Sequence, residues 1–389
     1  MSKPTERLFL STVAMQTDGS ARTPSQAFLR ARLLLGIEPE QFDTEAIGYV
    51  LDRPIFEKEA TKALTVPPYP YGTTLSLSQS AIQTFLRCPY RYYSTYQLKL
   101  REQKDSRPGL ADDGTFLHYV FEQFLRASLT EDGHLQIPPP EEIAPLADRI
   151  VSKYLGEVCP IEPERMDKRL LHIFARLQRL SLIMLRDILG ELQYSRFVPA
   201  RFEQRIGRGQ GETLPTVELD LKNGSRVILS GVIDRVDLYE GTDQKLYVRV
   251  VDYKSGTHRF RLEDVRTGMD IQLILYLFAV LSSNRERFAA GGAQYLYATN
   301  EKGKIGIGRS GFLLESEEMQ AAADTSEGAV YSKKLEKLKA NDIDALAADM
   351  KTAVASVAER ILAGEAQKTP SAEACQFCPV RTHCDQAYH

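Results

Sequence analysis

Two aspartates and a lysine lie in neighbouring apolar segments, where their side chains could do chemistry. Asp234 belongs to the segment 226–238, and Asp252 and Lys254 belong to the segment 246–254, with a stretch of turn-forming residues between the two. This pattern predicts two antiparallel strands joined by a hairpin. Because side chains alternate along a strand, Asp234 shares its face with valines, and so do Asp252 and Lys254. Each apolar face is therefore expected to carry a carboxylate at one end.

The chemistry of these three side chains depends on whether a cation joins them. A lone buried carboxylate is strongly unfavourable unless it is paired or bound to a metal. Two carboxylates offer the hard oxygen ligands that Mg²⁺ prefers, a metal-bound water becomes acidic enough to attack, and the lysine could orient that water or stabilise charge on a phosphate. An ordinary salt bridge among Asp234, Asp252 and Lys254 is the alternative, and their spacing alone does not decide.

The longer motif around these residues resembles a known nuclease family. Asp234 followed by Asp252, Tyr253 and Lys254 is similar to the D…(D/E)xK core of the PD-(D/E)xK nuclease superfamily. The string GVIDRVD…LYVRVVDYKSG resembles the RecB-like branch, and most closely the AddB family of helicase–nuclease subunits. The resemblance implies an α/β fold of the restriction-endonuclease type, with a central mixed sheet flanked by helices. It also implies that Asp234, Asp252 and the Tyr253 carbonyl hold Mg²⁺ or Mn²⁺, and that Lys254 assists the attacking water.

Two more motifs extend the implied site. The string GTFLHYVFE resembles the GTxxHxxxE motif, which implies that His118 is a metal ligand and leaves Glu122 as a ligand or as a hydrogen-bond partner of the histidine. Without the resemblance, a lone helical histidine is more often structural. Gln272 and Tyr276 are four residues apart, hence on one helical face, and resemble the Q-x3-Y motif that positions DNA and supports the metal site. Glu203 is left out of the predicted site because the pattern around it is weak.

Four of the five cysteines have a distribution that resembles the iron–sulfur staple of the AddB family. Three form C-x2-C-x5-C near the C-terminus, and one lies far upstream in FLRCPYRYY. A [4Fe–4S] cluster there would join the N- and C-terminal parts of the nuclease domain. A Cys₄ zinc site and unligated thiols are the alternatives. Cys159 is expected to be a buried or idle thiol, and His383 is a lower-ranked substitute ligand. The implied cluster ligands are Cys88, Cys375, Cys378 and Cys384.

Composition sets the broad class of the protein. The chain has 389 residues, of which 43% are hydrophobic and 26% charged, as is ordinary for a globular protein with room for two domains. No apolar run is long enough to span a membrane, and the first ten residues lack the apolar core of a signal peptide, so a cytoplasmic protein without membrane contact is expected. The net charge of −3 gives no overall attraction to nucleic acid, so DNA contacts must come from a local basic patch.

The chain is expected to consist of two parts. Residues 1–70 resemble the end of the helicase-like region of AddB proteins and form an N-terminal segment or linker, and residues 71–389 form the RecB-like nuclease domain. The phosphate-binding motif G-x-x-x-x-G-K-[ST] does not occur in the sequence. We therefore expect a C-terminal fragment or a truncated relative of the longer subunit.

Local patterns predict the elements that position the motifs. Apolar spacing of about 3.6 residues predicts helices, and alternation predicts strands. The predicted helices cover 75–88, 112–127, most of 141–192, the stretch around Gln272 and about 334–363; the predicted strands, besides the hairpin, cover 196–207, 292–299 and 303–312.

The resemblance implies a metal-dependent nuclease that cleaves single-stranded DNA during double-strand break resection and recombinational repair, beside an AddA-type helicase–nuclease partner. The expected products have 5′-phosphate and 3′-hydroxyl ends. One alternative is a free-standing RecB-like exonuclease of the CRISPR-adaptation kind. Another is a catalytically inactive iron–sulfur module that binds DNA ends, which the intact D…DxK motif disfavours.

Overall fold

A computed structural model provides the structure of the chain, which divides into two units, Met1–Ala63 and Leu64–His389. In the first unit the structure describes one helix, α1 (Gln26–Leu35). No helix within the described ranges is long and apolar enough to cross a membrane. The described residues are 26–36, 66–100, 113–158, 168–207, 212–301, 304–327, 329–371, 374–375, 378–381 and 384.

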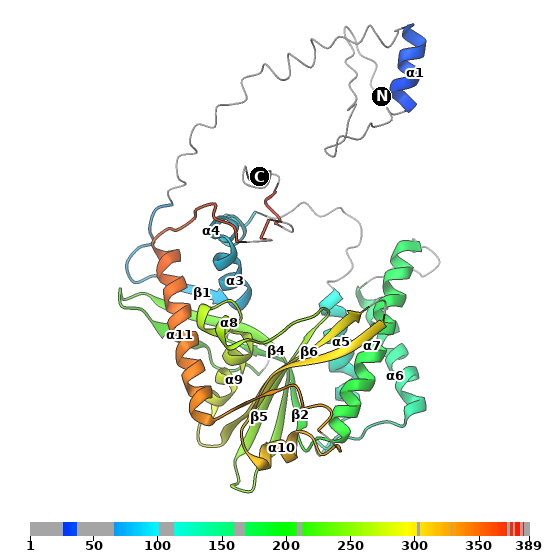
Figure 1. The fold of residues 1–389 in the computed structure, drawn as a ribbon, viewed down its shortest axis with the longest axis vertical. Helices are drawn as coiled ribbons and strands as arrows, with labels where there is room; N and C mark the ends of the chain where they lie inside the picture. Colours follow the sequence, from blue (N-terminus) through cyan, green and yellow to red (C-terminus); the bar gives the residue numbers. More distant parts are fainter. Residues whose placement is uncertain are drawn as a thin grey trace. The chain divides into compact units, whose positions relative to one another are not determined.

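The second unit is built on a mixed sheet that has eight strands in the described residues (Figure 1). The strand order is β1-β4-β5-β6-β7-β8, and β2 and β3 also pair with β4. This architecture confirms the predicted fold class, a mixed sheet flanked by helices. The strands are β1 (Thr74–Ser78), β2 (Val198–Ile206), β3 (Val217–Asp220), β4 (Arg226–Glu240), β5 (Leu246–Lys254), β6 (Phe288–Glu301), β7 (Lys304–Leu314) and β8 (Glu336–Leu338).

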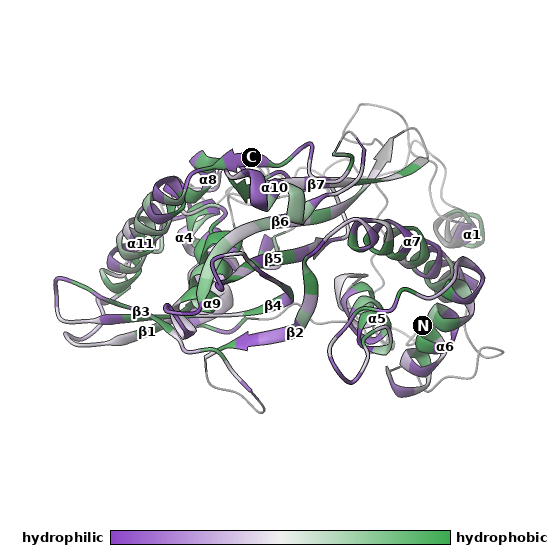
Figure 2. Ribbon diagram, turned by 90° about the horizontal axis from the view of Figure 1, so that it is seen from below, coloured by the Kyte–Doolittle hydropathy of each residue, from purple (hydrophilic) through white to green (hydrophobic). Residues whose placement is uncertain are grey.

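Helices cover both faces of the sheet, as Figure 2 shows. On β5, Val248 and Val250 pack in one apolar cluster, while Val251 and Tyr253 pack in another, as alternation along a strand requires. Helices α3, α9 and α11 join the first cluster, and α5, α6 and α7 join the second. The helices are α3 (Gln79–Arg87), α4 (Pro89–Tyr92), the π-helix η2 (Tyr93–Gln97), α5 (Asp113–Ala127), α6 (Pro140–Val158), α7 (Lys168–Gln193), α8 (Leu262–Thr267), α9 (Gln272–Ser283), α10 (Glu317–Ala323) and α11 (Ala340–Leu362).

Strand β4 is long enough to serve two groups of neighbours. Its first half pairs in parallel with β1 and antiparallel with β3, and its second half pairs antiparallel with β2 and β5. The change of neighbours falls near Gly231, where an added Cβ would lie 2.7 Å from the ring of Tyr276. A glycine therefore lets the α9 tyrosine approach the strand just before Asp234.

Two predicted helix starts are wrong in position. Residues 75–78 belong to strand β1, because Leu75 and Leu77 alternate inward and pair with β4; α3 begins only at Gln79, where the Ser78 side chain caps it by accepting from the Ala81 N–H. Helix α11 begins at Ala340, not near 334, because residues 336–338 form the edge strand β8. In both places, pairing with a distant strand overrides the local pattern.

Candidate active site

The β4–β5 hairpin brings the two predicted aspartates together. The antiparallel ladder ends at the pair Arg235 and Val251. Beyond it, the Tyr253 backbone N–H donates a hydrogen bond of 2.7 Å to Asp234 Oδ2. Only 6% of Asp234 and 1% of Asp252 is exposed to solvent. The hairpin expected from the sequence therefore forms, and both carboxylates lie buried at its open end.

Asp252 is held by Lys254 from its own strand and by Gln272 at the start of α9. Lys254 Nζ lies 2.6 Å from Asp252 Oδ2, and Gln272 Nε2 donates to Asp252 Oδ1 at 2.6 Å. Gln272 also accepts from Lys254 Nζ at 2.9 Å and donates to the Tyr276 hydroxyl at 3.1 Å. The structure thus joins the D-x-K and Q-x3-Y residues in one hydrogen-bonded group.

Helix α5 delivers His118 from the other face of the sheet. Its Nε2 lies 3.4 Å from Asp234 Oδ2 and 3.1 Å from the Tyr253 carbonyl oxygen. Its Nδ1 lies 3.7 Å from Glu203 Oε1. His118, Glu203 and Asp234 each offer one ligand atom, and these atoms lie within 4.8 Å of one another. All of the residues predicted for the catalytic and metal site therefore converge on one place.

Glu203 lies in this place although the sequence prediction left it out. Strand β2 pairs Phe202 with Arg235 and Gln204 with Ile233, while Glu203 itself has φ +47°, in the left-handed region that non-glycine residues rarely adopt. The turned backbone directs its carboxylate toward His118. The signal available in the sequence was an acidic residue within a strand that precedes the Asp234 strand; the backbone turn that aims it was not visible.

Glu122, the open candidate, contacts a different side chain. It accepts a hydrogen bond of 2.9 Å from Nε of Arg126, one helical turn further along α5. Such i,i+4 pairs are common on exposed helix faces. Neither proposed role of Glu122 beside His118 is supported by this contact.

The site carries more negative charge than its cations balance. Burial raises the pKa of Asp234 well above its usual range, and the charge of Asp252 adds to this. Burial also raises the pKa of Asp252, against the opposing effect of Lys254. The pKa of Glu203 rises to about 7, through burial and then the charges of Glu122 and Asp252. Buried carboxylates and an imidazole that hold protons against their ordinary tendency form a donor set that suits a hard divalent cation.

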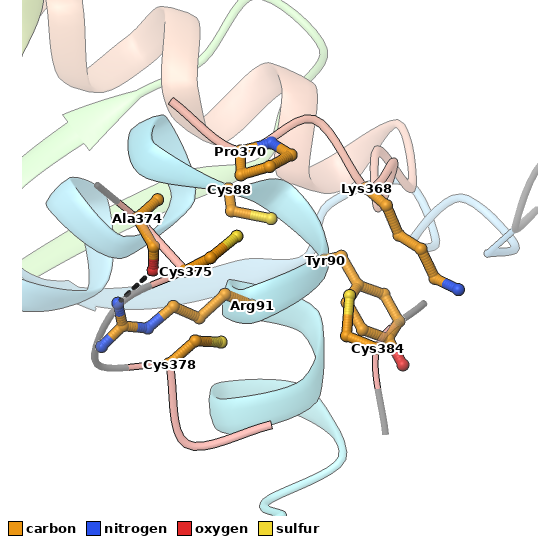
Figure 3. A pocket seen from close by; sticks show the side chains of 9 residues that line it. All are labelled: Cys88, Tyr90, Arg91, Lys368, Pro370, Ala374, Cys375, Cys378 and Cys384. Carbon is orange, nitrogen blue, oxygen red and sulfur yellow. Dashed lines mark hydrogen bonds between the residues drawn. The ribbon is translucent and has the colours of Figure 1, made fainter. Parts of the chain in front are cut away.

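A second group of residues joins the two ends of the nuclease region. Cys88, between α3 and α4, lines one pocket together with three cysteines near the C-terminus (Figure 3). Backbone hydrogen bonds hold the segments together: Tyr90 N–H donates to the Gln367 carbonyl at 3.1 Å, and Ser371 N–H donates to the Arg87 carbonyl at 2.8 Å. The other three cysteines are Cys375, Cys378 and Cys384.

The four thiols lie close enough to influence one another. Burial raises the pKa of the Cys88 thiol, and the charges of Cys378 and Cys384 raise it further. Thiolates that repel one another are the usual ligands of an iron–sulfur cluster or of zinc, which neutralises them. The arrangement fits either metal group, so the [4Fe–4S] assignment stays a prediction. Cys159 and His383 lie outside the described residues.

Comparison with known proteins identifies the family. Residues 76–385 match the sequence profile of the PD-(D/E)XK nuclease superfamily, which covers the hairpin, His118 and the cysteine pocket. The chain belongs to this superfamily. The resemblance drawn from the sequence motifs is thereby confirmed, and the mixed sheet with its two buried aspartates is the superfamily's fold and core in this chain.

Relatives of this PD-(D/E)XK nuclease domain have names that combine two activities. The ATP-dependent helicase/deoxyribonuclease AddB of Symbiobacterium thermophilum is 36% identical over 217 residues, covering 54% of this chain and 18% of that protein. The protein of the same name from Alkaliphilus oremlandii is 28% identical over 360 residues, covering 82% of this chain and 31% of that protein. The chain thus spans less than a third of the length of these relatives.

Proposed function

We propose that the chain is a metal-dependent deoxyribonuclease domain that cleaves single strands during double-strand break resection and recombinational repair, beside an AddA-type helicase–nuclease partner. One observation carries the proposal: the carboxylates of Asp234, Asp252 and Glu203 gather around His118 and Lys254 in a superfamily of nucleases. The names of the relatives support DNA as the substrate and a helicase partner. Residues 71–389 form the nuclease domain in this proposal, and residues 1–70 form the segment that precedes it.

The donors of the site fit Mg²⁺ or Mn²⁺. His118, Asp234, Asp252 and the Tyr253 carbonyl would hold the ion, and Glu203 is close enough to His118 to add a further oxygen. A bound ion of this kind supplies an acidified water and neutralises charge on the phosphate. Because burial raises the pKa of both aspartates, a cation would relieve an unfavourable charge that the metal-free protein carries.

The remaining residues of the site orient the reacting groups. An ammonium group has three donors, and Lys254 directs two of them to Asp252 and Gln272, so the third is left for the attacking water or a phosphate oxygen. Gln272 and Tyr276, fixed to one another, place the DNA strand against this lysine. Attack on the phosphorus with departure of the 3′ oxygen leaves 5′-phosphate and 3′-hydroxyl ends.

We assign a [4Fe–4S] cluster to the four-cysteine pocket. It would staple α3 and α4 to the C-terminal segment, which already approach one another through backbone hydrogen bonds. Anaerobic purification followed by an absorption spectrum and counting of iron and zinc tests the assignment. About four irons per chain supports the cluster, whereas a colourless protein with zinc would establish the Cys₄ zinc alternative.

The nuclease assignment is tested with labelled single-stranded DNA in the presence and absence of Mg²⁺. Asp252→Asn and Asp252→Ala should reduce the cleavage rate at least ~1000-fold, because each removes a charged ligand whose effect on the transition state amounts to several kcal/mol. Asp344→Asn, at an exposed position of α11, serves as the matched control. Circular dichroism should show that all variants fold.

Each outcome of this assay distinguishes the proposals. Cleavage by Asp252→Asn at the wild-type rate would show that the metal assignment is wrong. DNA binding by the wild-type protein without Mg²⁺-dependent cleavage would establish the binding-module alternative instead. Copurification with a helicase would separate the AddB-type role from that of a free-standing exonuclease.

A further inference from the structure

A polar chain of three residues that the motifs do not include lies beside the site. His258 Nε2 lies 2.9 Å from Asp270 Oδ2, and the Tyr295 hydroxyl donates to Asp270 Oδ1 at 2.6 Å. Asp270 is only 7% exposed and Tyr295 is fully buried. Both carboxylate oxygens of Asp270 are therefore engaged, one by the buried tyrosine and one by the histidine, which fixes the orientation of the imidazole.

The ring of Tyr295 connects this chain to the catalytic lysine. His258 packs against the ring edge-to-face with the centroids 4.2 Å apart, and Lys254 Nζ lies 5.3 Å from the centroid of the same ring. Tyr295 is also the β6 neighbour of Asp252 in the parallel ladder. The charge of His258 is among those that lower the pKa of Asp252, although burial has the larger effect and raises it. His258 and Lys254 thus border the same site.

The local chain holds His258 at a defined place. The segment that follows β5 is anchored where the Phe260 N–H donates to Ser310 Oγ of β7 at 2.8 Å. Asp270, two residues before Gln272, is anchored by its own N–H to the Asp264 carbonyl at 3.0 Å. The start of α9 therefore positions two side chains for the site: Gln272 for the Asp252–Lys254 pair and Asp270 for His258.

The second ring nitrogen of His258 is left for a ligand. The side chain is 33% exposed, and within the part of the chain that the structure describes Nδ1 has no hydrogen-bond partner. With Nε2 directed to Asp270, a protonated ring presents Nδ1–H as a donor. A phosphodiester oxygen is an acceptor that carries charge, and it is the group that a DNA strand presents most often to a protein.

We propose that His258 binds a phosphate oxygen of the DNA strand next to the phosphate that is cleaved, and that Asp270 and Tyr295 are positioning residues for its imidazole. This proposal rests on the proposed nuclease function, since it names a contact of the substrate of that same site. It gives the region beyond Lys254 a role in holding the strand in register, separate from the metal chemistry at Asp234 and Asp252.

The experiment measures binding of a fluorescent single-stranded oligonucleotide by anisotropy at several KCl concentrations. Ca²⁺ replaces Mg²⁺, and the pH is 6, below the ordinary histidine pKa of about 6.5. His258→Ala should weaken binding about tenfold and reduce the slope of log affinity against log salt by about 0.7, the value for one lost phosphate contact on a single strand. His258→Arg, which keeps a cationic donor, should restore the slope, and Asp270→Asn should lower the affinity less than His258→Ala does.

The matched control is His134→Ala, an exposed histidine in the turn after α5 that should change neither quantity. In Mg²⁺-dependent cleavage assays, His258→Ala should raise KM about tenfold and leave kcat within about threefold, as expected for a lost binding contact. A wild-type salt slope in His258→Ala, or a fall in kcat with unchanged KM, would overturn the phosphate contact alone. A wild-type protein that neither binds nor cleaves single strands would instead overturn the proposed function and this inference with it.

Discussion

The two faces of the β4–β5 hairpin both bury carboxylates, but in opposite electrostatic surroundings. On the face of the candidate site, Asp234 and Asp252 meet Lys254 and His118. On the face covered by α7, Asp237 is held by two arginines. Arg235 Nε lies 2.8 Å from Asp237 Oδ1, and Arg249 Nη2 lies 2.8 Å from Asp237 Oδ2. The same two strands therefore carry two polar clusters, one on each side of the sheet.

The α7-side cluster is a closed network in which charges are balanced. Arg249 also contacts Glu191 at 3.1 Å, and Glu191 accepts from Arg309 at 3.1 Å and from Gln294 at 2.8 Å. Burial alone would raise the pKa of Glu191, but Arg309 and Arg249 outweigh it and lower the pKa to about 2. Within the described residues, three arginines face three carboxylates here: Arg235, Arg249 and Arg309 with Asp187, Glu191 and Asp237.

Charge balance separates a structural cluster from a reactive one. In the α7-side cluster, every carboxylate has an arginine, so ionised forms are stable and no ligand is needed. In the candidate site, three carboxylates share one lysine and the pKa values of all three are raised, Glu203 to about 7. Nearly equal burial thus leads to opposite pKa shifts, and the excess negative charge marks the side that takes a divalent cation.

The largest stability effect is expected from breaking the balanced network. Arg249→Met leaves Asp237 and Glu191 buried with fewer cations and should lower the free energy of unfolding by about 3–5 kcal/mol. Arg266→Met is the control, since Arg266 contacts Asp349 at the surface, where such pairs contribute about 0–1 kcal/mol. Urea unfolding measures both. Equal losses for the two variants would show that the network does not hold the sheet to α7.

The opposite sign is expected on the site face. Asp234→Asn removes an unbalanced buried charge, while its side-chain oxygen can still accept from the Tyr253 N–H. In EDTA, this variant should exceed the wild-type free energy of unfolding by about 1–3 kcal/mol. Mg²⁺ should stabilise the wild type and leave the variant unchanged. A metal-free variant that is less stable than the wild type would contradict the charge imbalance.

A smaller effect is expected from the carboxylate on the turned backbone. Glu203→Gln keeps the shape of the side chain and removes its charge, so the Mg²⁺ concentration for half-maximal cleavage should rise about tenfold. Glu122→Gln, which alters the neighbouring carboxylate bound to Arg126, should shift it much less. If the two variants behave alike, Glu203 acts only through the general field and not near the ion.

The pH dependence of stability should reveal both clusters in one titration. Because the folded protein binds the Glu203 proton more tightly than the unfolded chain does, the stability of metal-free protein should rise by a small amount as the pH falls from about 7 toward 4.5. Below about 4.5 the sign reverses: Glu191, with a folded pKa of about 2, must then be protonated in the unfolded chain first, and its stabilisation is lost. Thermal melts in EDTA measure the profile, and Mg²⁺ should abolish the rise. A stability that falls steadily from pH 7 would contradict the raised pKa.

Local pattern was sufficient to predict the hairpin and the approach of its residues. Alternation along β4 and β5 places Asp234 and Asp252 at one end of the ladder, and a spacing of four residues places Gln272 beside Tyr276. Both are short-range consequences of backbone geometry. Bringing His118 to the same site required the family resemblance, because no local rule specifies where α5 packs.

Features that depend on distant partners could not be predicted. Glu203 enters the site through a positive φ in a strand, and no residue around it requires that conformation. His258 becomes part of the site only through Asp270 and Tyr295, which come from other elements. The residues of β1 form a strand because β4, about 150 residues later in the chain, pairs with them. In each case the deciding contact is tertiary.

The most direct test is Mn²⁺ binding by calorimetry at neutral pH, comparing the wild type with Asp234→Asn and with the surface control Asp344→Asn. If the unbalanced carboxylates hold the catalytic ion, the wild type and the control bind Mn²⁺ equally and Asp234→Asn loses more than about 100-fold in affinity. A wild-type protein that binds no Mn²⁺, or an Asp234→Asn variant that binds it as tightly, would contradict the account of the site.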